Sequence, residues 1–220
     1  MFESVNVIGR GRVGSAVAAR LEERGVELRV DAELVLLCVP DTAIADIARD
    51  VVPGHGRWLA HVSGATPLAA LEPHTRRFSM HPLQTFTRAR GPEQLDGAWA
   101  AVSGETPEAR AHGRELALTL GLRPFDLDDS ARTLYHAGAA IASNYLVTLY
   151  RAASRLFEDA GAPPEALVPL MTRTIENGFQ LTGPIARGDW AVVEAHLGAL
   201  HEAHPELEPM YRVLAEATAP

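Results

Sequence analysis

The chain has 220 residues, of which 47% are hydrophobic and 22% charged, and its formal net charge is −8 at pH 7. These values are typical of a globular protein with a sizeable core, and they argue against a nucleic-acid binder, which normally presents a basic face. The single cysteine, Cys38, excludes a disulfide framework and any multi-cysteine metal site. No apolar run approaches the roughly 20 residues of a membrane helix, and the start of the chain lacks a signal-peptide pattern. We therefore expect a cytoplasmic protein that binds neither membranes nor nucleic acid.

Lysine is absent, since all 20 of the Lys and Arg positions hold arginine. A GC-rich coding bias is the explanation that we favour for this composition. Whatever its origin, the absence excludes a Schiff-base lysine, a phosphate-loop lysine and a lysine general acid. Acid–base chemistry must then use His, Asp, Glu, Tyr, Cys or water.

The first part of the chain alternates strand and helix patterns. Apolar runs bounded by turn residues predict strands at 5–9, 34–39, 58–62, 77–80, 98–102 and 122–127. Helices are predicted at 15–24, 42–51 and 107–120, the first of them ending at Gly25. Such alternation predicts an α/β, Rossmann-like domain with a mainly parallel sheet and helices on its faces.

From about Asp129 the pattern becomes entirely helical. A long helix is predicted to about Asp159, then helices from Pro164 to about Gly178, from about Trp190 to Ala203, and a short one after Pro205. We therefore place a boundary near residue 128. Residues 1–128 form the predicted dinucleotide-binding domain, and residues 129–220 form an all-helical domain for substrate binding and dimerisation.

A glycine-rich turn, Gly9-Arg10-Gly11-Arg12-Val13-Gly14, follows the first strand and opens the first helix. This is the context that a dinucleotide fingerprint requires. Gly9 permits a tight turn, Gly11 lets the backbone approach a diphosphate, and Gly14 lets the helix pack on the strand. Unpaired amides at the helix start favour the anion, and Arg10 and Arg12 either add charge-assisted bonds or are solvated surface residues. A turn that uses small residues for packing alone is the other interpretation.

The next strand–helix unit is shortened. Residues 26–30 can form a second strand, and Asp31 follows the glycines at about the 20-residue distance of a ribose-binding acid. The strand at 34–39 then begins too soon for a parallel crossover, which needs about a dozen residues. We infer that one helix has been lost here, either alone or together with the strand before it. This region normally forms the wall of the pocket for the adenosine half of the cofactor.

Several strand ends carry residues suited to a ligand crevice. Val39 and Pro40 end the central strand and are expected to bound the cofactor, and Asp41 either joins them or caps the following helix. Cys38, one residue inside that strand, is expected to be a buried, inert thiol.

Polar residues end the next two strands as well. His61 and Ser63 follow one, and His81 and Gln84 end the other, so all four can converge on one cleft. Each histidine taken alone is as readily structural, but His81 precedes a proline at a strand end and is the one we favour.

The long helix carries a second polar group among its alanines. His136 and Ser143 are seven residues apart, which places them on nearly the same side of an α-helix, with Asn144 beside them. We expect this face either to line the cleft or to serve close helix packing with a buried amide. The segment 181–189 is predicted to be a polar loop between two helices. It either contacts the substrate, forms part of a dimer interface, or is simply a capped loop.

Six motifs occur in an order that resembles Rossmann-like proteins with a helical C-terminal domain of unknown function. The motifs are Val-Ile-Gly-Arg-Gly-Arg-Val-Gly (7–14), Val-Pro-Asp (39–41), His-Val-Ser-Gly (61–64), His-Pro-Leu-Gln-Thr-Phe (81–86), Tyr-His-Ala-Gly-Ala-Ala-Ile-Ala-Ser-Asn-Tyr (135–145) and Leu-Thr-Gly-Pro-Ile-Ala-Arg-Gly-Asp (181–189). These proteins look like relatives of the 6-phosphogluconate-dehydrogenase-like superfamily, with pyrroline-carboxylate, ketopantoate and deazaflavin-dependent NADP reductases. The resemblance spans nearly the whole chain and implies NADP or NAD as cofactor, a helical domain that often dimerises, and an active site between the domains. It supplies no substrate, and the missing lysine excludes the lysine-dependent mechanisms of some relatives.

Two hypotheses follow. The first is an NAD(P)-dependent oxidoreductase, expected to form a homodimer through its helical domain, that acts on a small carbonyl or imine substrate. Its cofactor would be held by Gly9, Arg10, Gly11, Arg12, Val13, Gly14, Val39 and Pro40. In this hypothesis His136 or His81 donates the proton, and Asn144 and Ser63 orient the carbonyl. The second is a degenerate Rossmann fold that binds a nucleotide or metabolite without turnover, which the shortened adenosine side favours.

Overall fold

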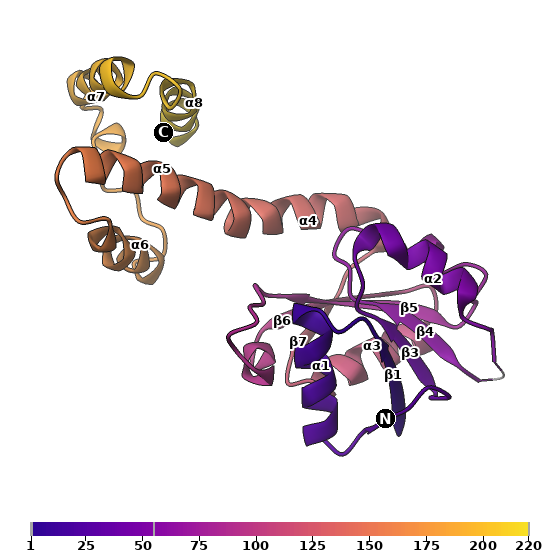
Figure 1. Ribbon diagram of the computed structural model, residues 1–220. Helices are drawn as coiled ribbons and strands as arrows, with labels where there is room; N and C mark the ends of the chain where they lie inside the picture. The colour runs from indigo at the N-terminus through magenta and orange to yellow at the C-terminus, as the bar shows by residue number, and fades with distance from the viewer. Residues whose placement is uncertain (1, 55, 220) are drawn as a thin grey trace. The chain divides into compact units, whose positions relative to one another are not determined.

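The computed structural model describes residues 2–54 and 56–219. The chain forms two compact units, Met1–Ser143 and Asn144–Pro220. The first unit is an α/β fold built on one sheet and the second is helical, as Figure 1 shows. Each unit is described by itself below.

A seven-stranded sheet, with the order β2-β1-β3-β4-β5-β6-β7, forms the centre of the first unit. The strands are β1 (Ser4–Ile8), β2 (Glu27–Leu28), β3 (Leu34–Leu37), β4 (Trp58–His61), β5 (Arg77–Leu83), β6 (Trp99–Gly104) and β7 (Arg123–Asp126). Neighbouring strands are parallel except β5 and β6, which are antiparallel. The predicted mainly parallel, Rossmann-like sheet is therefore confirmed.

Helices cover both faces of this sheet. The helices of the unit that pack on it are α1 (Arg12–Glu23), α2 (Ile44–Asp50) and α3 (Pro107–Thr119), and short 3-10 turns are η1 (Asp41–Ala43), η2 (Leu68–Leu71) and η3 (Pro92–Leu95). Alternate residues of β3 enter different cores: Leu34 and Leu36 join the core with α1 and α3, whereas Val35 and Leu37 join the core with α2. Because both faces are covered, the apolar run 34–37 is buried along its whole length.

The shortened unit retains its strand and loses its helix. β2 pairs only with Ser4 and Val5 of β1, and β3 begins at Leu34, which also lies opposite Val5. β2 and β3 therefore pair with opposite edges of β1, and both lie opposite Val5 of that strand. Residues 29–33 make this connection without a helix, and Asn6 Nδ2 donates to Val30 O at 3.2 Å. The expected loss of a helix is confirmed, and the argument that so short a crossover is impossible was wrong, because a two-residue β2 needs no long return.

A continuous helical run begins at Asp129, as predicted. Its parts are η4 (Asp129–Ala131), α4 (Arg132–Ala140), a π-helical turn η5 (Ile141–Tyr145) and α5 (Leu146–Asp159). The two compact units divide after Ser143, inside this run, whereas the predicted boundary near residue 128 lies where the run begins. The remaining helical elements are η6 (Pro164–Ala166), α6 (Leu167–Glu176), η7 (Ile185–Arg187), α7 (Trp190–Ala203) and α8 (Glu208–Thr218).

The helical unit has a small core and a polar clamp. Val193 and Leu197 of α7 pack with Ala215 of α8. The nearly buried His204 ring lies 2.5 Å from a carboxylate oxygen of Asp159, which ties the end of α5 to the end of α7. Among the described residues, no helix combines the length and the apolarity needed to span a bilayer.

Candidate active site at the carboxyl edge of the sheet

The glycine-rich turn leaves the start of α1 open. Gly11 is the N-cap residue, with extended backbone, no side chain caps the first helical amides, and the first turn holds no acidic residue. A Cβ atom built on Gly11 would meet nothing within 4 Å. The uncapped amides and the positive end of α1 therefore face free space, which is the arrangement that binds a phosphate group.

Gly9 and Gly14 are required by packing instead. Gly9 has φ of 99°, and a Cβ on Gly14 would lie 1.9 Å from the Gly9 carbonyl oxygen. A Cβ on Gly9 would lie 2.4 Å from the carbonyl oxygen of Cys38, at the end of the neighbouring strand. The turn is thus pressed against β3, and Gly9 and Gly14 leave no room for a Cβ atom.

Arginines surround this turn. A hollow of about 320 Å³ begins at Gly11, runs along α1 and reaches the loop 87–92, and its walls include Arg10, Arg12, Arg88 and Arg90. Arg90 pairs with Glu93, with 3.7 Å between Arg90 Nε and Glu93 Oε1. Within the described ranges, 2–54 and 56–219, the other three arginines form no ion pair, so their charge is available to an anion.

The segment after β3 borders the turn. Val39 lies against Gly9, since a Cβ atom built on Gly9 would be 2.9 Å from Val39 Cγ1. Pro40 is the N-cap residue of η1, and no side chain accepts a capping hydrogen bond there, so the capping role considered for Asp41 is not formed. Burial raises the pKa of the Cys38 thiol to about 12, which keeps this sulfur protonated and unreactive.

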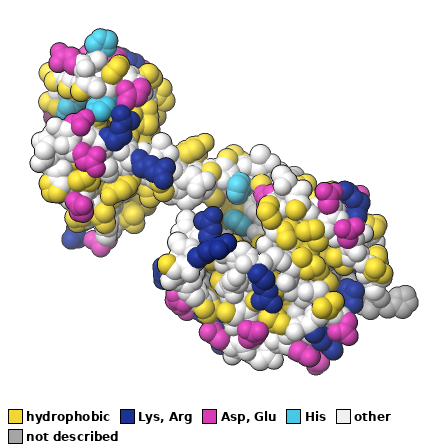
Figure 2. Space-filling model, in the orientation of Figure 1, with side chains coloured by type: hydrophobic (Ala, Val, Ile, Leu, Met, Phe, Trp, Pro, Cys, Tyr) yellow, Lys and Arg dark blue, Asp and Glu magenta, His cyan; other side chains and the backbone are white. Residues whose placement is uncertain are grey.

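Two histidine rings meet at Gly64, three residues after the end of β4. A Cβ on Gly64 would lie 2.8 Å from His136 Cδ2, 2.8 Å from His81 Cε1 and 2.9 Å from His81 Nε2. The ring centroids of His81 and His136 are 6.2 Å apart and nearly perpendicular. Figure 2 shows histidine and arginine side chains gathered on one face of the first unit. The absence of a side chain at position 64 is therefore what lets β5 and α4 present both imidazoles at one place.

Tyr135 is the hydrogen-bond partner of His81. Its hydroxyl lies 2.8 Å from His81 Nδ1. Burial, followed by the charges of His136 and Arg132, lowers the pKa of His81 to about 4, while Asp41 acts weakly in the opposite direction. Burial raises the pKa of Tyr135 to about 12. At neutral pH, His81 is therefore an uncharged imidazole and Tyr135 an uncharged phenol.

His61, the last residue of β4, is fully buried. Its Nδ1 accepts a hydrogen bond from the Ser63 amide at 3.2 Å, which places its proton on Nε2. Burial and the nearby charge of Arg132 lower the pKa of His61 to about 3. His61 is thus a neutral residue of the interior that shapes the following turn.

A buried arginine joins that turn to the start of α4. Arg132 is 1% exposed, its Nε donates to Asp129 Oδ1 at 2.6 Å, and its Nη1 donates to the Ser63 carbonyl at 3.0 Å. Asp129 also accepts from the amide of Leu68, in the segment that follows the turn. These contacts set the position of Gly64 relative to His136.

The other predicted site residues have the following places. Ser63 Oγ accepts from the Ala65 and Thr66 amides, so this hydroxyl holds its own turn. Gln84 is exposed and accepts from the adjacent Thr85 amide. Asn144 is exposed in the π-helical turn η5 and belongs to the second compact unit. The structure thus brings His81 and His136 together within the first unit.

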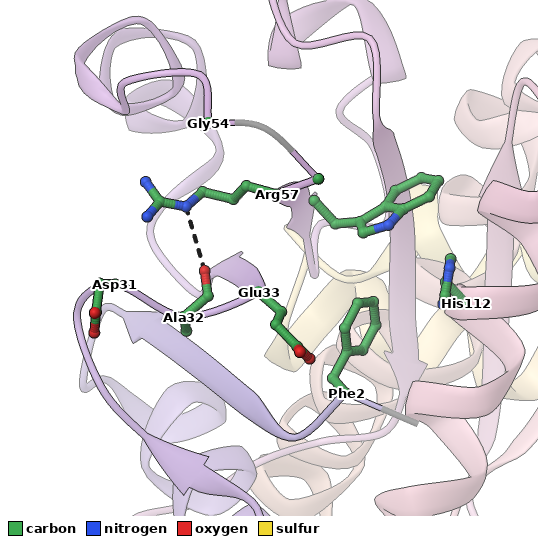
Figure 3. Close-up of a pocket in the computed structure, with 9 residues that line it drawn as sticks. Phe2, Asp31, Ala32, Glu33, Gly54, Arg57 and His112 are labelled. Atoms are coloured by element: carbon green, nitrogen blue, oxygen red, sulfur yellow. Dashed lines mark hydrogen bonds between the residues drawn. The ribbon is translucent and has the colours of Figure 1, made fainter.

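Asp31 does not lie at this edge. It lines a separate hollow of about 570 Å³ with Glu33, Arg57 and Trp58. Trp58 is the first residue of β4, so this hollow lies at the amino ends of the parallel strands. Figure 3 shows Asp31 and Glu33 on the connection between β2 and β3, with Arg57 Nε donating to Ala32 O at 3.2 Å. Asp31 is therefore at the wrong end of the sheet to hold a ribose beside Gly11.

Comparison with protein families gives a match over residues 98–218 to the family described as a domain of unknown function, DUF2520. The chain belongs to this family. No curated protein sequence matches the DUF2520 chain.

Solved structures share the fold of the DUF2520 chain. A Bacteroides fragilis protein, provisionally named an NADP oxidoreductase, is 22% identical with a TM-score of 0.82, and the match covers 97% of this chain and 96% of that one. A Thermotoga maritima protein is 23% identical with a TM-score of 0.72, over 97% and 98% of the two chains. Pyrroline carboxylate reductase of Plasmodium falciparum, solved with NADP bound, is 10% identical with a TM-score of 0.63, over 97% and 94%. The Rossmann-like fold with a helical C-terminal region is thus shown.

Sequence reasoning missed three residues of the DUF2520 site. Tyr135 stood out in the sequence but received no role, and Arg132 and Gly64 received none. The available signal for Gly64 was its position in the polar turn His61-Val62-Ser63-Gly64 at the end of a predicted strand. Nothing in the sequence marked Arg132 as buried, since charged residues three positions apart on a helix are usually solvated.

Proposed function

We propose that the chain is an NAD(P)-dependent oxidoreductase that acts on a small carbonyl or imine substrate. The observation that carries this proposal is the uncapped, unobstructed start of α1 at the same edge of the sheet as the paired imidazoles of His81 and His136. The resemblance of the fold to NAD(P)-linked reductases supports it.

The residues around the turn fit a nicotinamide dinucleotide. Gly9, Gly11 and Gly14, with the amides of Arg12 and Val13, would hold the diphosphate, and Arg10 and Arg12 would add charge. Val39 and Pro40 would bound the cofactor at the end of β3. When bound in its reduced form, the nicotinamide cofactor would supply the hydride, and the protein would supply orientation and proton transfer.

The histidines have different tasks in this proposal. Neutral His81 donates a hydrogen bond that polarises the substrate, and His136 donates the proton, a role suited to histidine near neutral pH. Asn144 orients the substrate, and Ser63 acts through the turn that it holds. The helical residues 129–220 supply His136 and Asn144, which is the reason for proposing a functional boundary near residue 128.

A homodimer through the helical unit is the second part of the proposal. Large apolar side chains of this unit are exposed, and Figure 2 shows hydrophobic side chains on its surface. Examples are Leu170, which is 60% exposed, and Phe179, which is 70% exposed. Exposed apolar side chains that gather into a large patch mark protein interfaces. Sedimentation equilibrium should give a dimer, and Leu170→Glu should shift it to monomer; a monomeric wild-type chain contradicts the proposal.

A non-catalytic nucleotide- or metabolite-binding module is the alternative. The loss of the helix after β2 and the displacement of Asp31 to the amino edge favour it, because both remove groups that normally hold adenosine.

A reductase screen separates the two functions. Wild-type protein, His81→Ala and His136→Ala are assayed with NADPH and NADH against carbonyl and cyclic imine panels. We expect turnover in the wild type, its loss in both variants, and retained nucleotide affinity. Tight nucleotide binding without turnover of any compound supports the alternative.

A further inference from the structure

The direction of the hydrogen bond between Tyr135 and His81 follows from the needs of the hydroxyl. A phenol has one proton to donate, and within the described residues the Tyr135 hydroxyl has His81 Nδ1 as its hydrogen-bond partner. If His81 donated instead, the half-buried phenol proton would lack an acceptor in the protein. A neutral imidazole nitrogen is a good acceptor, so Tyr135 donates and Nδ1 accepts. The His81 proton is then on Nε2.

The Nε2 atom is the one that lies toward Gly64 and His136. A Cβ on Gly64 would be 2.9 Å from it, so the two imidazole rings leave no room for a side chain at position 64. Within the part of the chain that the structure describes, no hydrogen bond reaches His81 Nε2. Tyr135 thereby makes His81 Nε2 an N–H group, and not a lone pair, toward whatever binds against that atom.

We propose that Tyr135 is a positioning residue that fixes His81 as an Nε2–H donor, and that the substrate reduced at this site is consequently an aldehyde or ketone and not a protonated imine. This inference rests on the proposed oxidoreductase function. A carbonyl oxygen has lone pairs that accept the Nε2–H bond, and they strengthen as acceptors when negative charge develops on the oxygen. A protonated imine has no lone pair on nitrogen and gains nothing from this donor.

The charges around His81 agree with this substrate class. Facing it are His136 and the buried guanidinium of Arg132, both of which disfavour a further positive charge, and the exposed carboxylate of Asp41, which has a smaller effect. His61 is neutral. The site is therefore better suited to developing negative charge than to a cationic substrate.

The reaction balances without another reactant. The carbonyl carbon gains a hydride, with two electrons, from the reduced nicotinamide, which becomes oxidised. The carbon–oxygen π bond breaks, its electron pair moves to oxygen, and the oxygen takes a proton from His136, giving an alcohol. His136 regains its proton from water.

The tautomer is tested directly by nitrogen NMR of histidine-labelled protein, without cofactor or substrate. Ring nitrogen shifts distinguish protonated from unprotonated nitrogens, and His81→Asn identifies the His81 signals. We expect His81 to carry its proton on Nε2 in the wild type, and Tyr135→Phe to produce a mixture of tautomers. Tyr211→Phe is the matched control, because Tyr211 OH lies 2.7 Å from Nδ1 of His196 in the helical unit. It should leave the His81 signals unchanged. A proton on Nδ1 in the wild type overturns the role of Tyr135.

Activity tests the substrate class separately. We expect turnover of carbonyl compounds, and a fall in kcat of about 10- to 100-fold in Tyr135→Phe with nucleotide affinity unchanged, because the donor loses its fixed geometry. Turnover of cyclic imines alone overturns the carbonyl assignment. No turnover of either class, with nucleotide binding intact, overturns it together with the oxidoreductase function, whereas the NMR result for Tyr135 stands independently.

Discussion

Arg132→Met should destabilise the first unit through the loss of the clamp between the Ser63 turn and α4. Methionine keeps much of the side-chain volume but removes the guanidinium group, which donates hydrogen bonds to Asp129 and to the Ser63 carbonyl. Arg132 as a whole is only 1% exposed. Breaking a buried pair costs about 3–5 kcal/mol when the remaining charge stays buried. The Asp129 side chain is 34% exposed, so water can solvate it after the change. We therefore expect a loss somewhat below that range, about 2–3 kcal/mol.

Urea unfolding, followed by circular dichroism, measures this loss as a lower midpoint at unchanged slope. Arg173→Met is the control, because Arg173 pairs with Glu176 on the surface and is 71% exposed. Its effect should stay within about 0.5 kcal/mol. Equal midpoints for the two variants would refute the buried clamp. Since Arg132 lowers the pKa of His81, the same variant should raise that pKa, which the histidine NMR signals report.

Three further predictions concern the site. Gly14→Ala should cost about 1–3 kcal/mol in unfolding free energy, because its Cβ would lie 1.9 Å from a carbonyl oxygen; unchanged stability would show that the turn is looser than described. The free energy of unfolding should fall as the pH drops from 6.5 toward 4, by about 1.4 kcal/mol per pH unit for each of His61 and His81. In the folded state the pKa values of both histidines lie below 6.5, so over this range only the unfolded chain binds a proton at each of them. A flat profile over this range contradicts buried neutral histidines. Gly64→Ala should lower turnover about 10- to 100-fold with nucleotide affinity retained, as both imidazoles must move; steady-state kinetics with full activity would exclude the close approach.

Local patterns in the sequence were sufficient to predict the sheet and the glycine turn. The run Leu34–Leu37 lacks polar interruption because both of its faces are covered, and Gly9 and Gly14 are small because carbonyl oxygens leave no room for a Cβ. These are interactions between residues close in sequence or on adjacent strands. The missing helix after β2 was also predictable, since its residues are simply absent.

Long-range contacts were beyond the same patterns. The path of residues 29–33 depends on where β2 stops pairing with β1, and this placed Asp31 at the amino edge despite its favourable spacing. The burial of Arg132 depends on the carbonyl of Ser63, 69 positions away in the chain. The π-helical turn at Ile141–Tyr145 has no sequence mark, and it changes the angular relation that α-helical spacing predicted for His136 and Ser143.

The central claim is that the start of α1 receives the diphosphate of a nicotinamide dinucleotide. Calorimetric titration of NADPH and NADH into the wild-type chain and Gly11→Val tests it most directly. A Cβ atom at position 11 would meet no protein atom within 4 Å, so a side chain there extends into the space proposed for the ligand. We predict saturable binding of at least one dinucleotide to the wild type, and a loss of at least about 10-fold in affinity, or about 1.4 kcal/mol, in a variant whose thermal midpoint is nearly unchanged. Absence of binding to the wild type, or equal affinity in Gly11→Val, would contradict the claim.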